Sequence, residues 1–139
     1  MALKELDFLN IDGMYGGNQY LFTHPRMYRG GCSTVCACHA AVCLANRNPE
    51  KKYISPVLNL NMTKDEFAQF ATEMFKYVYP QRRGIDSIQL YEEAFLNYAS
   101  TTGVDIRFHS MSGQAKYEDA KSFIKSHIDS GYTVQYLLL

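Results

Sequence analysis

The segment from Cys32 to Asn46 limits most strongly what this chain can fold into. Its sequence, CSTVCACHAAVCLAN, is small or apolar almost all round and contains neither glycine nor proline. This pattern is typical of a helix that is buried on most of its sides. Gly30 and Gly31 directly precede it, and glycine allows a tight turn and a close approach of the backbone. We therefore expect a helix that begins directly after a turn and is covered by the rest of the chain.

The pattern of apolar residues and helix stops predicts three further helices and two strands. The second helix begins with a capping box, in which Thr63 is followed three residues later by Glu66, and it ends before Pro80. Gly103 and Gly131 terminate the third and fourth helices. The expected order is helix, helix, helix, strand, helix, strand, over residues 32–46, 63–79, 87–101, 104–110, 117–131 and 132–139. This order predicts an α+β fold with the helices concentrated early.

A single domain is the simplest organisation for 139 residues, since a chain of this length buries enough surface to fold without disulfides or metals. Hydrophobic residues make up 47% of the chain and the formal net charge is zero, which is the composition of a globular protein. A neutral chain has no electrostatic attraction for nucleic acid or for an anionic membrane, so neither is expected as a partner.

The sequence predicts a cytoplasmic location. The longest apolar run, from Ala40 to Ala45, is far shorter than the roughly 20 residues that cross a bilayer. The N-terminus lacks the basic and apolar regions of a signal peptide. All four cysteines lie in one segment, so they cannot join distant parts of the chain as the disulfides of secreted proteins do. We therefore expect reduced thiols.

A single stripe along the first helix is formed by Cys32, Cys36, His39 and Cys43. The stripe is about 16 Å long at 1.5 Å per residue, and one metal ion cannot reach all of it. Zinc and iron–sulfur sites also usually take their ligands from two separate segments. We therefore predict no metal site and no cofactor. Space-filling apolar residues are the better interpretation of Cys36, Cys38 and Cys43.

Cys32 differs from the other cysteines because it stands in the first turn of its helix. The helix dipole favours an anion there and therefore favours the thiolate, which is the nucleophilic form of cysteine. The free N–H groups of the same turn can donate to an oxyanion that forms on a substrate carbonyl. Gln19, in the glycine-rich arm over residues 1–31, offers a side-chain amide as a second donor. Cys32 and Gln19 are therefore the candidate catalytic residues.

A glutamine in a glycine-rich segment, followed by Gly30, Gly31 and Cys32 at the start of a buried helix, resembles the papain-like cysteine peptidase superfamily. The similarity is greatest to its bacterial C39-like branch. The GID sequence at residues 84–86 and the closing YTVQYLLL are also similar to the middle of such chains. The resemblance thus covers most of the 139 residues.

The resemblance implies a papain-like fold, in which a helical N-terminal lobe over residues 32–103 is followed by a partial antiparallel β-lobe over residues 104–139. It also implies a hydrolase that acts on a peptide or protein. In such an enzyme Cys32 is the nucleophile and Gln19 supplies the amide of the oxyanion hole.

Members of that superfamily carry the catalytic histidine on strands beyond the one that YTVQYLLL resembles, and this sequence ends there. His39 is about 10 Å from Cys32 by helical rise, too far to accept its proton. No spacing argument brings His24 or His109 to the site, and His127 is interpreted as an edge residue of an amphipathic helix. We therefore expect a fragment or truncated product with little or no hydrolytic activity, unless His24 or His109 supplies the base.

Two functions from different classes stay open. In the first, the full-length protein is a cysteine peptidase homologue that attacks peptide or amide carbonyls through Cys32. In the second, the chain is a non-catalytic binding or interaction domain that keeps the cysteine-bearing helix for packing. A last strand over residues 132–139 without a neighbour would present an unpaired apolar edge, so we also expect the chain to self-associate there.

Overall fold

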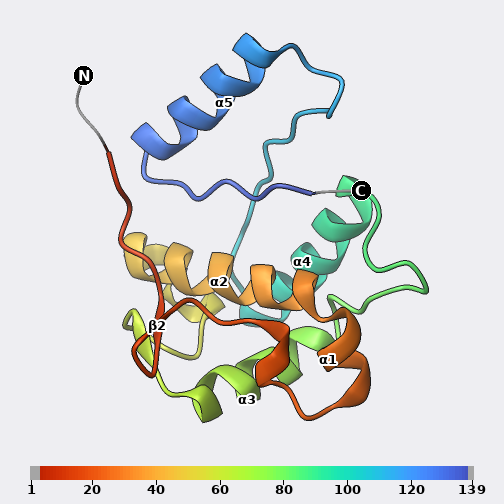
Figure 1. Cartoon of the computed structure of the whole chain (residues 1–139). Helices are drawn as coiled ribbons and strands as arrows, with labels where there is room; N and C mark the ends of the chain where they lie inside the picture. The colour runs from red at the N-terminus through yellow and green to blue at the C-terminus, as the bar shows by residue number, and fades with distance from the viewer. Residues whose placement is uncertain (1–3, 138–139) are drawn as a thin grey trace.

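The computed structural model describes residues 4–137 and shows an α+β protein in which helices predominate (Figure 1). The α-helices of this part of the chain are α1 (Pro25–Gly30), α2 (Cys32–Arg47), α3 (Lys64–Phe75), α4 (Ile88–Thr102) and α5 (Tyr117–Asp129). The shorter elements are the 3-10 helices η1 (Gln19–Leu21) and η2 (Pro49–Ile54) and the strands β1 (Asn10–Ile11), β2 (Met14–Tyr15) and β3 (Asn61–Met62). The four predicted helices are confirmed, and α1 is an additional short helix that was not predicted.

Helix α2 runs through the middle of the body, with α1 and α3 on one side and α4 beside it (Figure 1). The residues that it buries are small, which lets the neighbouring elements approach closely: Thr34, Val35, Ala37, Cys38, Ala41, Val42, Cys43 and Ala45. The buried hydroxyl of Thr34 donates a 2.9 Å hydrogen bond to the carbonyl oxygen of Val78, just after α3. The prediction of a helix covered on most of its sides is therefore confirmed.

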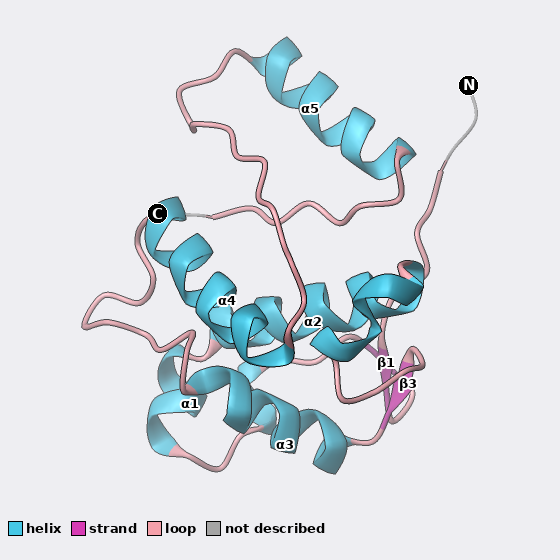
Figure 2. Ribbon diagram, turned by 180° about the vertical axis from the view of Figure 1, so that it is seen from behind, coloured by secondary structure: helices cyan, strands magenta, loops and turns pink. Residues whose placement is uncertain are grey.

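The N-terminal arm is part of the core. Leu9 and Ile11 are fully buried, and β1 pairs antiparallel with β2 and parallel with β3 to form a small sheet (Figure 2). Asp12 and Gly13 take the turn between β1 and β2 with φ values of 47° and 84°. Such left-handed conformations favour glycine and short polar residues. The sheet thereby holds the arm in place directly before η1 and Gln19.

Helices α3 and α4 begin as their sequences predict. The Thr63 hydroxyl accepts from the Glu66 N–H at 3.1 Å, and the Glu66 carboxylate accepts from the Thr63 N–H at 2.8 Å, which confirms the capping box. Ser87 caps α4 by accepting from the N–H of Leu90 at 3.1 Å. Gly103 ends α4 in the left-handed region, with φ of 73°.

The two strands predicted for the C-terminal part are not formed within the described residues. Residues 104–110 and 132–137 are extended but pair with no other strand, and residues 138–139 lie outside the described part. None of the residues 105–137 is buried, and α5 lies at the end of the molecule opposite α3 (Figure 1). Alternating apolar residues form a strand only when a neighbour takes up their backbone hydrogen bonds. The expected partial antiparallel β-lobe is thus replaced by one exposed helix and two extended segments.

Among the helices of residues 4–137, none combines the length and the apolar character that crossing a membrane requires.

Replacing Gly31 by alanine should destabilise the junction between α1 and α2. An added Cβ would overlap the carbonyl oxygen of Met27 and would lie 3.2 Å from the ring of Phe22. We expect Gly31→Ala to lower the free energy of unfolding by about 1–3 kcal/mol, measured by chemical denaturation. Gly113→Ala is the matched control, because an added Cβ there meets no atom within 4 Å. Equal stability of the two variants would contradict this prediction.

Candidate functional site

Cys32 is the first residue of α2, and its side chain is exposed. Gly31 occupies the N-cap and has no side chain with which to cap the helix. The Gly31 N–H donates to the Met27 carbonyl at 2.8 Å, and the Gly31 carbonyl accepts from the Val35 N–H at 2.9 Å. As at the start of any α-helix, the first amides of α2 have no acceptor within the helix. Cys32 therefore stands among N–H groups that can stabilise an anion.

Gln19 lies beside this junction. Its side-chain amide donates a 3.0 Å hydrogen bond to the carbonyl oxygen of Tyr28. In a continuous helix that carbonyl would accept from the N–H of Cys32, four residues later. Because α1 ends at Gly30, the Gln19 amide takes this acceptor instead. The structure thus holds both predicted site residues at the boundary between α1 and α2.

The other three cysteines fall into two groups. Cys38 and Cys43 are buried, as predicted, and burial raises the pKa of both thiols. Cys36 is exposed, so its interpretation as a buried packing residue is wrong. It lies one turn after Cys32 on the same face of α2. The neighbouring elements do not cover this face. Partial burial, and to a lesser extent the neighbouring Cys32, raise the pKa of the Cys36 thiol.

His39 has a structural position. Its Nε2 accepts a 3.0 Å hydrogen bond from the Gly17 N–H, and its ring contacts Phe8 and Phe67. Burial lowers the pKa of His39 to about 4, so the ring is neutral at pH 7. A neutral Nε2 that accepts from Gly17 ties the N-terminal arm to α2. Its distance along α2 from Cys32 is about 10 Å by helical rise, as the sequence indicates.

The remaining histidines are also engaged away from Cys32. His24 caps α1, where its Nδ1 accepts from the N–H groups of the next two non-proline residues. It stands at the opposite end of α1 from Cys32, eight residues earlier in the chain. His109 and His127 contact each other, with 3.3 Å between His109 Nδ1 and His127 Nε2. Within the described part of the chain, no hydrogen bond joins Cys32 to a histidine.

The C-terminal segment contacts the uncovered side of α2. The Gln135 amide donates a 3.0 Å hydrogen bond to the carbonyl oxygen of Cys36. The hydroxyl of Tyr91, on α4, is buried near Gln135 without a hydrogen bond of good geometry, and burial raises its pKa. Sequence reasoning missed the contact of Gln135, because the last segment was expected to be a strand. No local pattern in the sequence indicates that Gln135 reaches α2.

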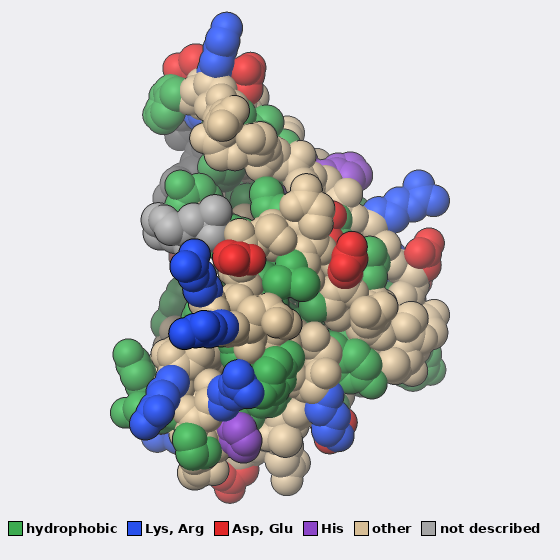
Figure 3. Space-filling model, turned by 90° about the vertical axis from the view of Figure 1, so that its right-hand side faces the viewer, with side chains coloured by type: hydrophobic (Ala, Val, Ile, Leu, Met, Phe, Trp, Pro, Cys, Tyr) green, Lys and Arg blue, Asp and Glu red, His purple; other side chains and the backbone are tan. Residues whose placement is uncertain are grey.

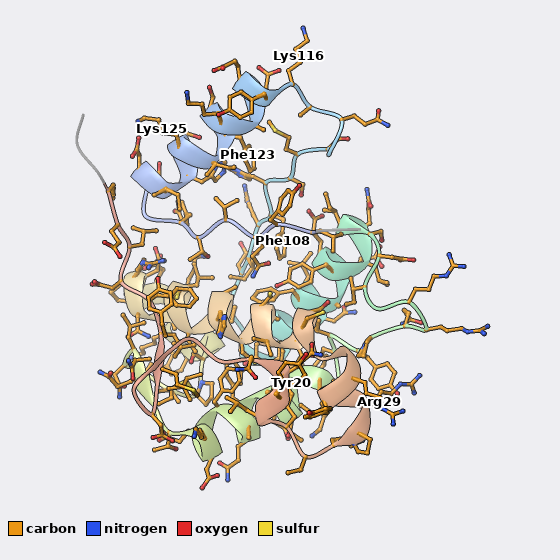
Figure 4. The ribbon with its side chains drawn as sticks, in the orientation of Figure 1. Tyr20, Arg29, Phe108, Lys116, Phe123 and Lys125 are labelled. Atoms are coloured by element: carbon orange, nitrogen blue, oxygen red, sulfur yellow. The ribbon has the colours of Figure 1, made fainter. Side chains whose placement is uncertain are left out.

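Exposed arginines lie on the elements next to the α1–α2 junction. Arg26 and Arg29 belong to α1, and Arg82 and Arg83 to the loop between α3 and α4. Figure 3 shows basic side chains gathered on this side of the molecule, and Figure 4 labels Arg29. Because the chain is neutral overall, this concentration of positive charge is local. Of these four side chains, Arg26 is engaged with Tyr79, whose hydroxyl accepts a hydrogen bond from its guanidinium.

A groove of about 550 Å³ lies elsewhere, between η2, α3 and α4, and its walls include Tyr53, Phe70 and Tyr98. Two carboxylates line it, but both are already engaged. Glu66 belongs to the capping box of α3, and Glu73 pairs with Lys76 at 2.7 Å. The groove contains no nucleophile and no residue of α1 or α2.

Comparisons of the chain with protein-family models, with curated proteins and with solved structures give no significant match.

The low pKa of His39 predicts a loss of stability in acid. The unfolded chain, in which histidine has its ordinary pKa of 6.5, binds a proton that the folded chain does not bind until about pH 4. The stabilisation is therefore complete above pH 6.5 and is lost as the pH falls to about 4. We expect the free energy of unfolding to fall by up to about 3 kcal/mol over this range from this group.

The control is His39→Gln, which keeps an acceptor for the Gly17 N–H but does not titrate. Denaturation curves of both proteins between pH 7 and 4 measure the difference. An identical pH dependence of the two would show that His39 is not the titrating group.

Proposed function

We propose that this chain is a papain-like cysteine peptidase homologue of the C39-like kind, with Cys32 as its nucleophile. The observation that carries the proposal is the position of an exposed thiol at the start of α2, where no side chain caps the helix, with the Gln19 amide bound to the Tyr28 carbonyl in the preceding helix. The proposed substrate is a peptide or protein. The papain-like fold is part of the same proposal.

The chemistry that this arrangement supports is attack by the Cys32 thiolate on a peptide or amide carbonyl. The first amides of α2 point towards charge that develops at the start of the helix. Gln19 uses one N–H of its amide to bind Tyr28, and a primary amide has a second N–H that can donate to an oxyanion. Arg29 adds positive charge in the preceding turn. In the proposed reaction, these groups stabilise the oxyanion that forms at the start of α2.

A general base for Cys32 is not found among the four histidines, because each is held by other groups. This observation favours the second candidate, a non-catalytic binding or interaction domain, for residues 4–137 by themselves. In that case Cys32 reacts with an acyl donor without repeated turnover. A cytoplasmic location is part of the proposal, and the four free thiols support a reducing compartment.

The proposal predicts that Cys32 is alkylated faster than Cys36. Both thiols are exposed and lie one turn apart on α2, so Cys36 is a matched internal control. The first amides of α2 can donate to a group at Cys32, whereas partial burial raises the pKa of the Cys36 thiol. With dilute iodoacetamide at pH 7, we expect Cys32 to react at least about tenfold faster, measured by mass mapping of peptides over time.

Equal rates at Cys32 and Cys36 would remove the case for an activated thiol. An activated ester distinguishes the two candidate functions in the same samples. One equivalent of product per chain without further release indicates a thiol without a base. Sustained release that is absent from Cys32→Ser indicates an enzyme.

We also propose that residues 132–137 mediate self-association with a second copy of the chain. The segment is extended, pairs with no described strand and exposes Tyr132 and Tyr136, the latter to 83%. Unpaired extended backbone with exposed apolar side chains is a template for pairing with another chain.

Sedimentation over a concentration series should therefore show a dimer that increases with concentration and is weakened by Tyr136→Ser. Tyr53→Ser is the control, because Tyr53 is similarly exposed, at 69%, but lies on η2. A monomer at all concentrations, or equal effects of the two substitutions, would argue against association through this segment.

A further inference from the structure

Two histidine rings meet where α5 approaches the segment that leads into it. His109 lies on the extended segment after α4, and His127 lies in the last turn of α5. Their facing nitrogens, His109 Nδ1 and His127 Nε2, are 3.3 Å apart, and the rings are nearly perpendicular, at 83°. The two residues are 18 positions apart in the sequence, so the fold alone brings them together.

The spacing of the two nitrogens matches the coordination of a metal ion. Nitrogen ligands of tetrahedral zinc lie about 2.0–2.1 Å from the metal, which places two of them about 3.3–3.4 Å from each other. Imidazole is a preferred ligand of zinc and of other divalent transition metals. The pair therefore needs little rearrangement of its nitrogens to become two ligands of one ion.

His127 is also oriented as a metal ligand. Its Nδ1 lies 2.7 Å from the carbonyl oxygen of Phe123, and because a carbonyl only accepts, Nδ1 carries the proton. The lone pair of His127 is therefore on Nε2, the nitrogen that faces His109. Metal-bound histidines commonly donate their other N–H to a carbonyl or carboxylate in this way. The Phe123 ring packs on the imidazole, with 4.2 Å between centroids, and holds it in place.

The residues on either side of His109 attach its segment to α4. The hydroxyl of Ser110, the next residue, donates to the carboxylate of Glu92 on α4. Phe108, the preceding residue, packs its ring on that of Phe95, also on α4, with 5.6 Å between centroids. In Figure 4, Phe123 lies on α5 and Phe108 on the segment that leads to it. His109 is thus attached to α4, and His127 to α5.

We propose that His109 Nδ1 and His127 Nε2 bind a divalent transition-metal ion such as Zn²⁺, with water molecules in the remaining coordination positions. Without metal, His109 donates its Nδ1 proton to His127 Nε2. On binding, His109 takes the tautomer that carries its proton on Nε2, so both facing lone pairs point to the metal. The described residues contain no cluster of three or more histidine, cysteine or acidic side chains that could hold an ion, so the protein supplies two ligands.

Such an ion would fasten α5 to the body of the protein. None of the α5 residues is buried, so few apolar contacts hold this helix. The other long-range polar contact at its end is the hydrogen bond from the Lys4 ammonium to the Asp129 carbonyl, at 2.7 Å. Elements with little buried surface open locally at low free-energy cost. A metal ion that binds only when His109 and His127 are in contact stabilises the arrangement in which α5 is held against the segment before it.

The test uses the full chain without a histidine tag, carrying Cys32→Ser and Cys36→Ser to remove exposed thiols that also bind zinc. Calorimetric titration with zinc chloride should show one ion per chain. Zinc should also shift the ¹⁵N signals of His109 Nδ1 and His127 Nε2 and slow amide hydrogen exchange in α5. His109→Gln and His127→Gln should each weaken binding by more than about tenfold, because loss of a second-shell partner already costs that much.

The control is His24→Asn, which removes an exposed imidazole elsewhere and keeps a good N-cap for α1. Its zinc affinity should be unchanged. Unchanged affinity in His109→Gln, or zinc binding that leaves both ring signals in place, would overturn the proposal. The ring signals are measured with both histidines present, so this result does not depend on the folding of a variant. Because Cys32 is replaced throughout, the outcome is independent of the proposed peptidase function.

Discussion

Close packing around α2 is the constraint on which the rest of the structure depends. The side chains that α2 buries are small, and they let the N-terminal arm, α3 and η2 approach its backbone. Polar contacts complete this packing: the Thr34 hydroxyl binds the Val78 carbonyl and His39 binds the Gly17 N–H. Both bonds satisfy groups that burial would otherwise leave unpaired, at a cost of about 1–3 kcal/mol each. The start of α2 is thereby held in one position relative to the arm.

The candidate site follows from the break between α1 and α2. Gly31 can occupy the junction because it has no side chain to meet the Met27 carbonyl. Because the helix is interrupted, the Tyr28 carbonyl accepts a hydrogen bond from Gln19. The first amides of α2 have no acceptor within the helix. Cys32 stands at this point, and the proposed function assigns it the role of nucleophile. In the described residues, all four histidines are engaged with groups other than Cys32: His39 with Gly17, His24 with the start of α1, and His109 and His127 with each other.

Different interactions hold the C-terminal part and the body of the protein in place. Residues 105–137 bury no side chain, so aromatic contacts and a few hydrogen bonds determine where α5 and the last segment lie. Gln135 connects that segment to α2 beside the candidate site, and the histidine pair connects α5 to the segment before it. A ligand that binds across such contacts changes local stability more than it would in the body, because little buried surface opposes opening.

The sequence by itself determined the four long helices, because a capping box, helix-ending glycines and the spacing of apolar residues act within a few positions of each other. It also indicated Cys32, since the pair of glycines before a run of small residues marks the start of a buried helix. Only the tertiary structure decided that Cys36 is exposed, that 104–110 and 132–137 lack strand partners, and that Gln135 and the histidine pair lie where they do. These features depend on which distant segments meet. Local propensity carries no information about such meetings, because strand pairing and side-chain exposure are set by neighbours far away in the chain.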